Sequence, residues 1–355
     1  MKKRILVIFG GTSTEHEVSL KSSASIISML DSEKYDVVKV GITTDGLWLK
    51  TNACPEQIQD GSWKSLPDNV RAILSPDRED AGLILKRDSG MELVKVDCVW
   101  PVLHGKYGED GTIQGLFELA GLPYVGPGVC ASAVSMDKSQ TKIVVETSGV
   151  KQADYYLIRK LAYRKNADME IAAVQAHFNQ QFPLFVKPCS AGSSIGVTKV
   201  SCKEDLKGAI EEALLHDNKV LVEEAIIGRE VEVAMIGNDV PRASVVGEVL
   251  SANEFYDYSA KYLNSASMTQ IPADLREEDQ IRIQEAAITV YSVLECKGLT
   301  RVDFFLTEDG TPVFNEVNTL PGFTNISMYP KLWEASGISN TELVDMLIEL
   351  ALEHQ

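Results

Sequence analysis

The sequence lacks long apolar runs and a cleavable leader. No uninterrupted apolar stretch approaches the ~20 residues that a membrane-spanning helix needs. The basic residues at the N-terminus precede a short apolar run that stops at Gly10 and Gly11, and no small-residue cleavage site follows. We therefore expect neither a signal peptide nor a membrane span.

Positive charge and paired cysteines are also scarce. The 34 Lys and Arg residues are outnumbered by 51 Asp and Glu residues, for a formal net charge of -17. This balance argues against a nucleic-acid partner and against an anionic membrane surface. The six cysteines are scattered without a C-x-x-C pair, and no two of the five histidines have metal-ligand spacing. We expect reduced, mostly buried thiols in a cytoplasmic protein, with no disulfide framework or zinc site.

Strand-like and helix-like stretches alternate from the beginning of the chain, which predicts an α/β fold class. Residues 5–9 form a continuous apolar run that ends in glycine, a pattern typical of a buried parallel strand. A second buried strand is expected at residues 94–102. The length of 355 residues indicates two or three domains, and we expect boundaries near residues 126 and 222.

A hairpin near the C-terminal end carries the clearest chemical pattern. Residues 301–306 and 312–318 are expected to be its strands, with residues 308–311 as a four-residue loop. In that register Asp303 lies opposite Glu316, so two carboxylates face one another.

The same register places Arg301 opposite Asn318 on the same face of the hairpin. Oxygen ligands at this density suit Mg²⁺ that bridges the phosphates of a nucleotide. An arginine beside the metal can stabilise a developing negative charge. The alternative is a solvated polar face with a salt bridge, which explains Arg301 and Glu316 but not Asn318.

Two lysines are candidates for binding phosphate. Lys187 ends a strand and precedes a loop of small residues, 189–196, whose backbone N–H groups can fold over phosphates. The loop matches neither of the common glycine-rich nucleotide fingerprints, and a tight turn between strands is the alternative. Lys138 is either a second phosphate-binding cation or a surface residue on a helix.

The turn after the first strand carries acidic residues where anions usually bind. Glu15 and Glu17 would repel a phosphate, which suggests a cationic ligand, such as a substrate ammonium, near Glu15. The alternative is an acidic first helical turn. His104, just before Gly105, either binds substrate or satisfies a backbone carbonyl.

Residues 254–262 combine aromatic and charged side chains in a region of weak periodicity. We interpret them as part of a lid, about residues 246–266, that closes over the site. Lys261 would reach the nucleotide, and Tyr262 would help to exclude water. A surface hairpin is the alternative.

Taken together, these patterns resemble the D-alanine:D-alanine ligase family, whose fold is the ATP-grasp. The resemblance extends from residue 9 to about residue 330, nearly the whole chain. The matching segments, in the family's order, are FGGTSTEHEVS, VLHGKYGEDGTIQGLFELAGLPYVG, SAVSMDK, FVKPCSAGSSIGVTKV, FYDYSAKY, RVDFF and FNEVNTLPGFTNISMYP. It implies an N-terminal Rossmann-like parallel-sheet domain at 1–126, a central ATP-grasp domain at 127–222 and a C-terminal ATP-grasp domain at 223–355.

The resemblance also implies a role for each matching residue. Contacts to ATP are implied for Lys138, Lys187, Ser194, Glu223, Glu224, Ala225, Ile226, Glu230 and Lys261. Two Mg²⁺ ions, for which Mn²⁺ can substitute, are implied at Asp303, Glu316 and Asn318. Substrate contacts are implied for Glu15, which would hold the first ammonium, and for His104, Ser327 and Met328. Arg301 and the Gly322 N–H would stabilise a tetrahedral intermediate, and Ser193 and Tyr262 would join Glu15 in a hydrogen-bonded network.

The implied activity is ATP-dependent joining of two D-alanines through an acyl phosphate, for peptidoglycan precursor synthesis by a cytoplasmic homodimer. D-serine as the second substrate is the nearest alternative. A catalytically silent nucleotide-binding module is a further alternative, against which the full set of hairpin residues argues. A dinucleotide-dependent oxidoreductase is disfavoured because no G-x-G-x-x-G follows the first strand.

Overall fold

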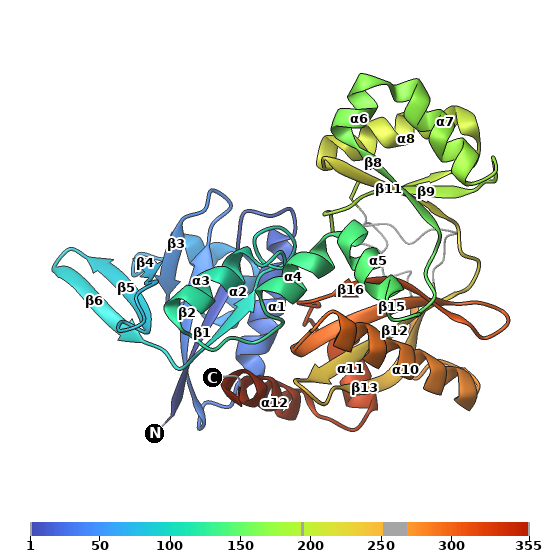
Figure 1. Cartoon of the computed structure of the whole chain (residues 1–355). Coiled ribbons are helices and arrows are strands. Elements are labelled where there is room, and N and C mark those ends of the chain that lie inside the picture. The colour runs from blue at the N-terminus through green and yellow to red at the C-terminus, as the bar shows by residue number, and fades with distance from the viewer. Residues whose placement is uncertain (1, 193–194, 251–267, 354–355) are drawn as a thin grey trace.

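The computed structural model describes residues 2–192, 195–250 and 268–353, and its strands form three sheets that follow one another along the chain (Figure 1). The first sheet lies to one side, in blue, and the other two lie one above the other (Figure 1). Four predicted site residues, Ser193, Ser194, Lys261 and Tyr262, fall outside the described residues.

The first sheet has seven strands in the order β6-β5-β4-β3-β2-β1-β7. Its strands are β1 (Lys3–Gly10), β2 (Tyr35–Ile42), β3 (Trp48–Thr51), β4 (Val70–Leu74), β5 (Gly82–Arg87), β6 (Gly90–Lys95) and β7 (Cys98–Val102). β1 pairs in parallel with β2 and β7 and is fully buried from Ile5 to Phe9, which confirms the predicted parallel strand. The pairs from β2 to β6 are antiparallel, so the sheet is Rossmann-like at its β2-β1-β7 end.

The predicted strand at residues 94–102 was wrong in its first part. β6 ends at Lys95 on the outer edge of the sheet, whereas β7 begins at Cys98 beside β1. Between them the backbone N–H of Asp97 donates to the carbonyl of Arg4 at 2.9 Å. The run of apolar residues could not show that the chain changes its partner strand.

Helices cover the first sheet and connect it to the second. They are α1 (His16–Met29), α2 (Pro55–Gln59), the short 3₁₀ helix η1 (Ser62–Ser65), α3 (Thr112–Ala120), α4 (Val129–Met136) and α5 (Lys138–Glu146). Gly121 ends α3 in the left-handed region at φ 62°, a conformation that glycine adopts without strain.

The second sheet has four strands in the order β10-β9-β11-β8, all antiparallel. Its elements are β8 (Tyr155–Arg159), α6 (Lys160–Lys165), α7 (Ala167–His177), β9 (Leu184–Pro188), β10 (Thr198–Val200), α8 (Lys203–His216) and β11 (Lys219–Glu224). The predicted boundary at residue 222 falls inside β11, so this unit extends at least to Glu224.

The third sheet has five strands in the order β14-β13-β12-β15-β16. Its elements are β12 (Arg229–Gly237), β13 (Arg242–Leu250), β14 (Met268–Gln270), α10 (Glu277–Val293), β15 (Gly298–Leu306), β16 (Pro312–Asn318), α11 (Met328–Ala335) and α12 (Asn340–Glu353). The predicted lid begins within β13, and its residues 251–266 lie outside the described residues.

The predicted pairing of the hairpin is confirmed. Asp303 pairs with Glu316 and Arg301 with Asn318. The loop starts one residue earlier than expected, at Thr307, and a bulge after Asp303 restores the predicted pairs.

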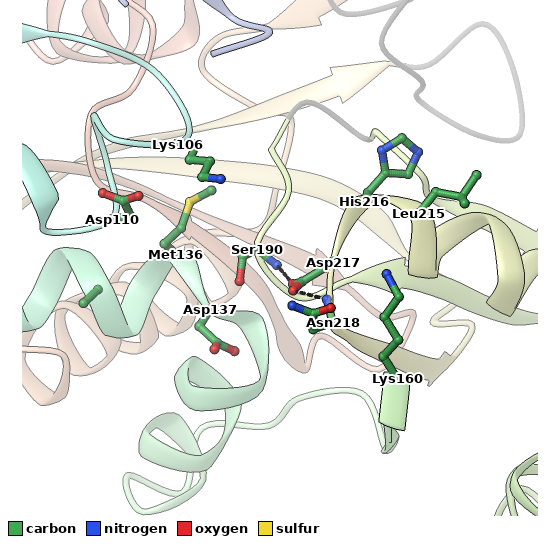
Figure 2. A pocket seen from close by; sticks show the side chains of 11 residues that line it. Lys106, Asp110, Met136, Asp137, Lys160, Ser190, Leu215, His216, Asp217 and Asn218 are labelled. Atoms are coloured by element: carbon green, nitrogen blue, oxygen red, sulfur yellow. Dashed lines mark hydrogen bonds between the residues drawn. The ribbon is translucent and has the colours of Figure 1, made fainter. Parts of the chain in front are cut away.

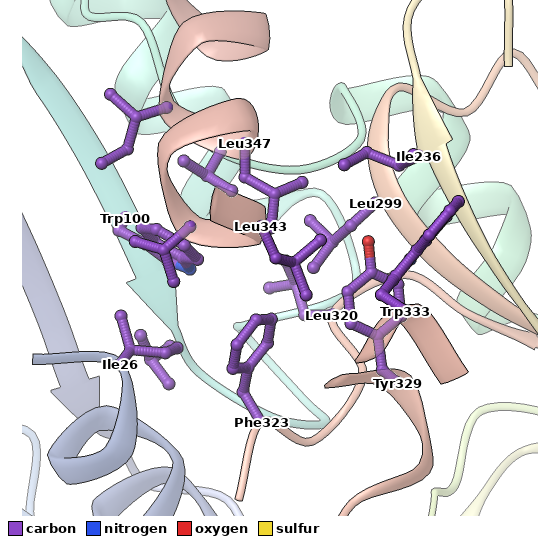
Figure 3. Close-up of a cluster of buried hydrophobic side chains, with 14 of the residues drawn as sticks. Ile26, Trp100, Ile236, Leu299, Leu320, Phe323, Tyr329, Trp333, Leu343 and Leu347 are labelled. Atoms are coloured by element: carbon purple, nitrogen blue, oxygen red, sulfur yellow. The ribbon is translucent and has the colours of Figure 1, made fainter. Parts of the chain in front are cut away.

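One hydrophobic core joins the two ends of the chain (Figure 3). Trp100 from β7 and Phe323 from the segment after β16 meet edge to face, with ring centroids 6.1 Å apart. Leu343 and Leu347 from α12 belong to the same cluster. The C-terminal helix therefore fastens the third sheet to the first.

Within the described residues no helix is long and apolar enough to cross a membrane. Of the free cysteines, Cys98, Cys189 and Cys296 are buried, whereas Cys54, Cys130 and Cys202 are exposed. The expectation of mostly buried thiols was therefore only half correct.

Candidate active site

The hairpin gathers three of its predicted residues into one cluster. Arg301 donates from Nε and Nη2 to the two carboxylate oxygens of Asp303, at 2.8 and 2.7 Å. The side-chain amide of Asn318 donates to the same carboxylate at 3.0 Å. Because Asp303 is only 2% exposed, this fork is shielded from solvent and holds the guanidinium in one orientation.

A further carboxylate, Glu232, completes the arginine site. It lies on β12 in register with Asp303, and its Oε2 is 2.9 Å from Nε of Arg301. Burial alone would lower the pKa of Arg301, but Asp303 and Glu232 raise it well above its ordinary value. Glu232 was not predicted from the sequence. The alternation from Glu230 to Glu232 is its only signal there, because the pairing of β12 with β15 is visible only in the fold.

Lys138 is placed beside the hairpin, not on the outer surface of a helix. Its backbone N–H donates to the carbonyl of Cys189 at 3.0 Å, and its Nζ donates to the carbonyl of Ala191 at 3.1 Å. The same Nζ is 3.5 Å from Oε2 of Glu316. Lys138 therefore connects the small-residue loop with the carboxylate hairpin.

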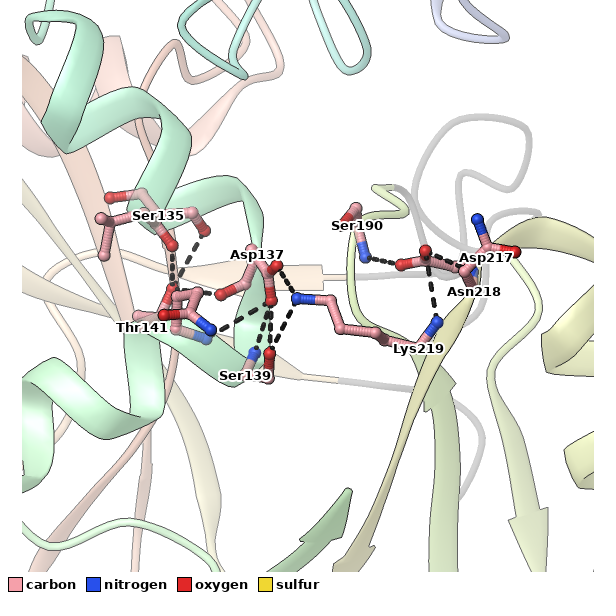
Figure 4. Close-up of polar contacts among 10 residues, drawn as sticks. Ser135, Asp137, Ser139, Thr141, Ser190, Asp217, Asn218 and Lys219 are labelled. Carbon is pink, nitrogen blue, oxygen red and sulfur yellow. Dashed lines mark hydrogen bonds and ion pairs between the residues drawn. The ribbon is translucent and has the colours of Figure 1, made fainter. Parts of the chain in front are cut away.

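The turn that carries Lys138 is anchored to the second sheet (Figure 4). Asp137 caps α5 by accepting from the backbone N–H groups of Ser139 and Gln140. Its carboxylate also forms an ion pair with Lys219, at the start of β11. On the loop side, Asp217 accepts from the backbone N–H of Ser190 at 2.8 Å. These contacts fix the lysine relative to the loop.

Lys187 and a second lysine, Lys142, both form ion pairs with the buried carboxylate of Glu223. Glu223 forms an ion pair with Lys187, and its other oxygen is 3.0 Å from Nζ of Lys142. Burial opposes ionisation of Glu223, but the two lysines outweigh it and hold its pKa below the ordinary value. Lys142 also donates to the carbonyl of Ala153 at 3.1 Å and lies over the ring of Tyr155. Lys142 was not predicted from the sequence.

We expect Lys142→Met to weaken both stability and nucleotide binding. The buried Glu223 would keep only Lys187 as its partner, so the free energy of unfolding should fall by about 3 kcal/mol. Lys187, for which the resemblance implies a contact to ATP, would then be held more firmly by Glu223. The KM for ATP should rise about tenfold, which is ~1.4 kcal/mol of binding. Denaturant unfolding and steady-state kinetics measure the two effects. The exposed Lys165→Met is the control, and an unchanged KM would contradict this role.

The other predicted adenine and ribose residues follow Glu223 along the chain. Ala225 and Ile226 are half-buried. Glu224 is exposed, and its carboxylate accepts from the backbone N–H of Asp154 at 2.8 Å. Glu230 is half-buried on β12, in register with Phe305.

Glu15 is buried where the first sheet meets the small-residue loop. It is 8% exposed, and a β-carbon built on Gly192 would lie 2.9 Å from its Oε2. A β-carbon on Gly105 would overlap the same oxygen. The carboxylate therefore lies against two glycines, Gly105 and Gly192.

His104 is engaged with the protein through both ring nitrogens. Nδ1 lies 2.9 Å from the carbonyl of Leu320, and Nε2 lies 3.2 Å from Oγ of Ser22. Burial lowers the pKa of His104, so the neutral ring is favoured. A carbonyl can only accept, which assigns the proton to Nδ1. Of the two interpretations left open by the sequence, the backbone contact is observed.

Gly322 and Ser327 lie close together after β16. A β-carbon built on Gly322 would lie 3.0 Å from Oγ of Ser327. That hydroxyl accepts from the backbone N–H of Thr324 at 3.0 Å. Met328, the next residue, is buried at the start of α11.

A hollow of about 510 Å³ is lined by residues next to Lys138 in the chain, among them Met136 and Asp137 (Figure 2). Lys106, Lys160 and His216 are among its lining residues. None of the predicted ATP-binding residues in the described part of the chain lines it. The hollow is therefore adjacent to the candidate active site but separate from it.

The fold and the site define an ATP-grasp enzyme, with Lys187 at the end of a strand of one antiparallel sheet and a carboxylate hairpin in the other. The chain matches the family described as D-ala D-ala ligase, with the N-terminal part at residues 4–127 and the C-terminal part at residues 144–349. The chain therefore belongs to the D-alanine–D-alanine ligase family.

Individual relatives agree with this assignment. The chain is 50% identical to the D-alanine–D-alanine ligase of Acetivibrio thermocellus, over 99% of this chain and 96% of the relative. It is 48% identical to D-alanine–D-alanine ligase B of Clostridium tetani, over 100% of this chain and 95% of the relative.

Solved structures show the same fold. The VanG D-Ala:D-Ser ligase from Enterococcus faecalis superposes with a TM-score of 0.90 at 41% identity, covering 99% of this chain and all of that one (100%). The D-alanine–D-alanine ligase from Coxiella burnetii superposes with a TM-score of 0.86 at 36% identity, covering 99% and 94%.

Proposed function

We propose that this enzyme joins two D-alanines to D-alanyl-D-alanine, using ATP and releasing ADP and phosphate, as a step in peptidoglycan precursor synthesis. Family membership over the whole chain supports the activity. The observation that carries the proposal is the Arg301–Asp303–Asn318 cluster, with Lys138 beside Glu316. This arrangement brings anion-stabilising and phosphate-binding groups together in one place.

The proposed nucleotide site lies between the second and third sheets. Lys138 and Lys187, with Ser194 and Lys261, would bind the phosphates. Glu223, Glu224, Ala225 and Ile226 would contact the adenine, and Glu230 the ribose. When Lys187 turns to a phosphate, Lys142 would remain at Glu223 and keep that buried carboxylate compensated.

The donor set of the hairpin fits Mg²⁺. Asp303, Glu316 and Asn318 supply only oxygen ligands, and their backbones pair across one hairpin. We propose that they hold two Mg²⁺ ions, or Mn²⁺ in their place. When bound, the ions would offset charge on the transferring phosphoryl group. Arg301 would then have to release at least one oxygen of Asp303. The ion pair with Glu232 would keep the Arg301 guanidinium in place.

In the proposed reaction, the carboxylate of the first D-alanine attacks the γ-phosphorus, and ADP leaves. Glu15 would hold the ammonium of that substrate, in a network with Ser193 and Tyr262. The free amine of the second D-alanine, held at Ser327 and Met328, then attacks the acyl carbon. Arg301 and the Gly322 N–H would bind the oxyanion until phosphate leaves.

D-serine as the second substrate is the alternative with a specific observation behind it. The VanG D-Ala:D-Ser ligase superposes on the whole chain. The curated relatives named D-alanine–D-alanine ligase are more similar in sequence, at up to 50% identity. We therefore propose D-alanine at both positions.

A panel of D-amino acids tests this proposal. Phosphate release from ATP should require D-alanine, and D-alanine alone should give the dipeptide as the main product. Product analysis with D-alanine and D-serine together should show mostly D-alanyl-D-alanine. A predominance of D-alanyl-D-serine would favour the alternative. Turnover with another carboxylate and amine, but not with D-amino acids, would refute the proposed substrate class.

We further propose a cytoplasmic homodimer with a substrate domain at residues 1–126 and two ATP-grasp domains. The sheets support a division after about residue 126 and another after β11. Residues 340–353 follow the third sheet in the chain but also pack on the first sheet. The C-terminal helix therefore belongs to the hydrophobic core that both sheets share.

A further inference from the structure

The segment from Leu320 to Phe323 is held by three side chains from the N-terminal part of the chain. The backbone N–H of Leu320 donates to Oε1 of Glu109 at 3.0 Å, and its carbonyl accepts from Nδ1 of His104 at 2.9 Å. The backbone N–H of Phe323 donates to Oγ of Ser22 at 3.2 Å. These contacts fix the peptide groups on both sides of the Pro321–Gly322 peptide.

Packing and hydrogen bonding have different effects on this segment. Leu320 is 4% exposed and Phe323 is 1% exposed, and both side chains lie in the shared core (Figure 3). Apolar packing locates the chain but does not select the direction of a peptide N–H. Pro321 restricts its own φ, so the flanking hydrogen bonds determine where the Gly322 N–H points.

Glu109 also binds the segment that encloses Glu15. Its Oε2 accepts from the backbone N–H of Gly105 at 2.7 Å. Gly105 lies against the carboxylate of Glu15, where an added β-carbon would overlap Oε2. One side chain therefore connects the proposed ammonium site with the proposed oxyanion site.

We propose that Glu109 is a positioning residue for the second half of the ligation, which holds the 320–323 segment so that the Gly322 N–H faces the tetrahedral intermediate. This inference rests on the proposed function. Glu109 is not proposed to contact substrate. It acts through the backbone of Leu320 and Gly105, and the attack of the amine on the acyl phosphate is the step that depends on it.

Both carboxyl oxygens of Glu109 accept a backbone hydrogen bond, so Glu109→Gln tests its positioning role directly. Burial, together with the charge of Glu15, raises the pKa of Glu109 to about 8. Both carboxyl oxygens can accept a hydrogen bond in either protonation state, whereas an amide offers only one acceptor. Glu109→Gln would therefore leave one backbone N–H facing a second donor, with little change of shape.

The experiment separates the two half-reactions of the full-length enzyme. Exchange of the oxygen that bridges the β- and γ-phosphates of ATP, with D-alanine present, reports formation of the acyl phosphate. Dipeptide formation reports both steps. We expect Glu109→Gln to lower the kcat for dipeptide by about 10- to 100-fold, as for a misplaced catalytic group, and to change the isotope exchange by less than about threefold. Hydrogen exchange at the amides of residues 320 and 323 should accelerate.

Controls distinguish positioning from general damage. Glu118→Gln, on the exposed face of α3, should leave both rates unchanged. If the glutamine variant does not fold, Glu109→Asp is the second test, because its side chain is too short for both contacts. It should also lower dipeptide formation much more than isotope exchange. Equal loss of isotope exchange and dipeptide, or normal dipeptide formation, would overturn the proposal. Absence of D-alanine-dependent exchange in the unchanged enzyme would instead refute the proposed function.

Discussion

Replacing Glu316 with glutamine is expected to lower dipeptide formation by about 10³-fold, because metal-assisted charge stabilisation contributes several kcal/mol. The substitution keeps the shape of the side chain but removes one of the two carboxylates that face each other across the hairpin. Lys138, 3.5 Å away, would also lose its charged partner there. The rate at saturating ATP and the Mg²⁺ concentration for half-maximal rate are the measurements.

The fold should survive this substitution. The Glu316 side chain is 25% exposed and lies at the site, outside the apolar core, so thermal unfolding should change little. Glu308→Gln, in the exposed loop of the same hairpin, is the matched control and should turn over normally. A Glu316 variant with normal turnover at low Mg²⁺ would show that the hairpin is not the metal site.

Arg301→Lys is expected to lower kcat by about 10²- to 10³-fold, the effect of removing one oxyanion donor. Lysine cannot reproduce the two parallel hydrogen bonds to Asp303 while facing Glu232. Because the proposed interaction is made with the intermediate, the KM for ATP should change by less than about threefold. Steady-state kinetics with ATP and D-alanine varied separately measure both parameters.

Arg276→Lys provides the matched control for this substitution. Arg276 also forms a fork with a carboxylate, Asp279, but its side chain is 67% exposed and it lies at the start of α10. Its replacement should leave kcat unchanged. If Arg301→Lys changes kcat and the KM for ATP equally, then Arg301 binds nucleotide or supports the fold, and does not act on the intermediate.

The sequence by itself determined the features that depend on neighbours along the chain. The pairing of Asp303 with Glu316 followed from strict alternation and a short loop, because a hairpin leaves few possible registers. The buried parallel strand at residues 5–9 followed from an unbroken apolar run. The family followed from ordered motifs, each of which is a contiguous segment.

Only the tertiary structure decided the contacts between distant segments. Glu109 and Leu320 are 211 positions apart, and no local pattern connects them. Glu232 reaches Arg301 because β12 pairs with β15, and Lys142 on α5 reaches Glu223 on β11, 81 positions further along the chain. These partners became visible only when the chain had folded, because burial of a charged group is stable only where another segment supplies its counter-charge or hydrogen bond.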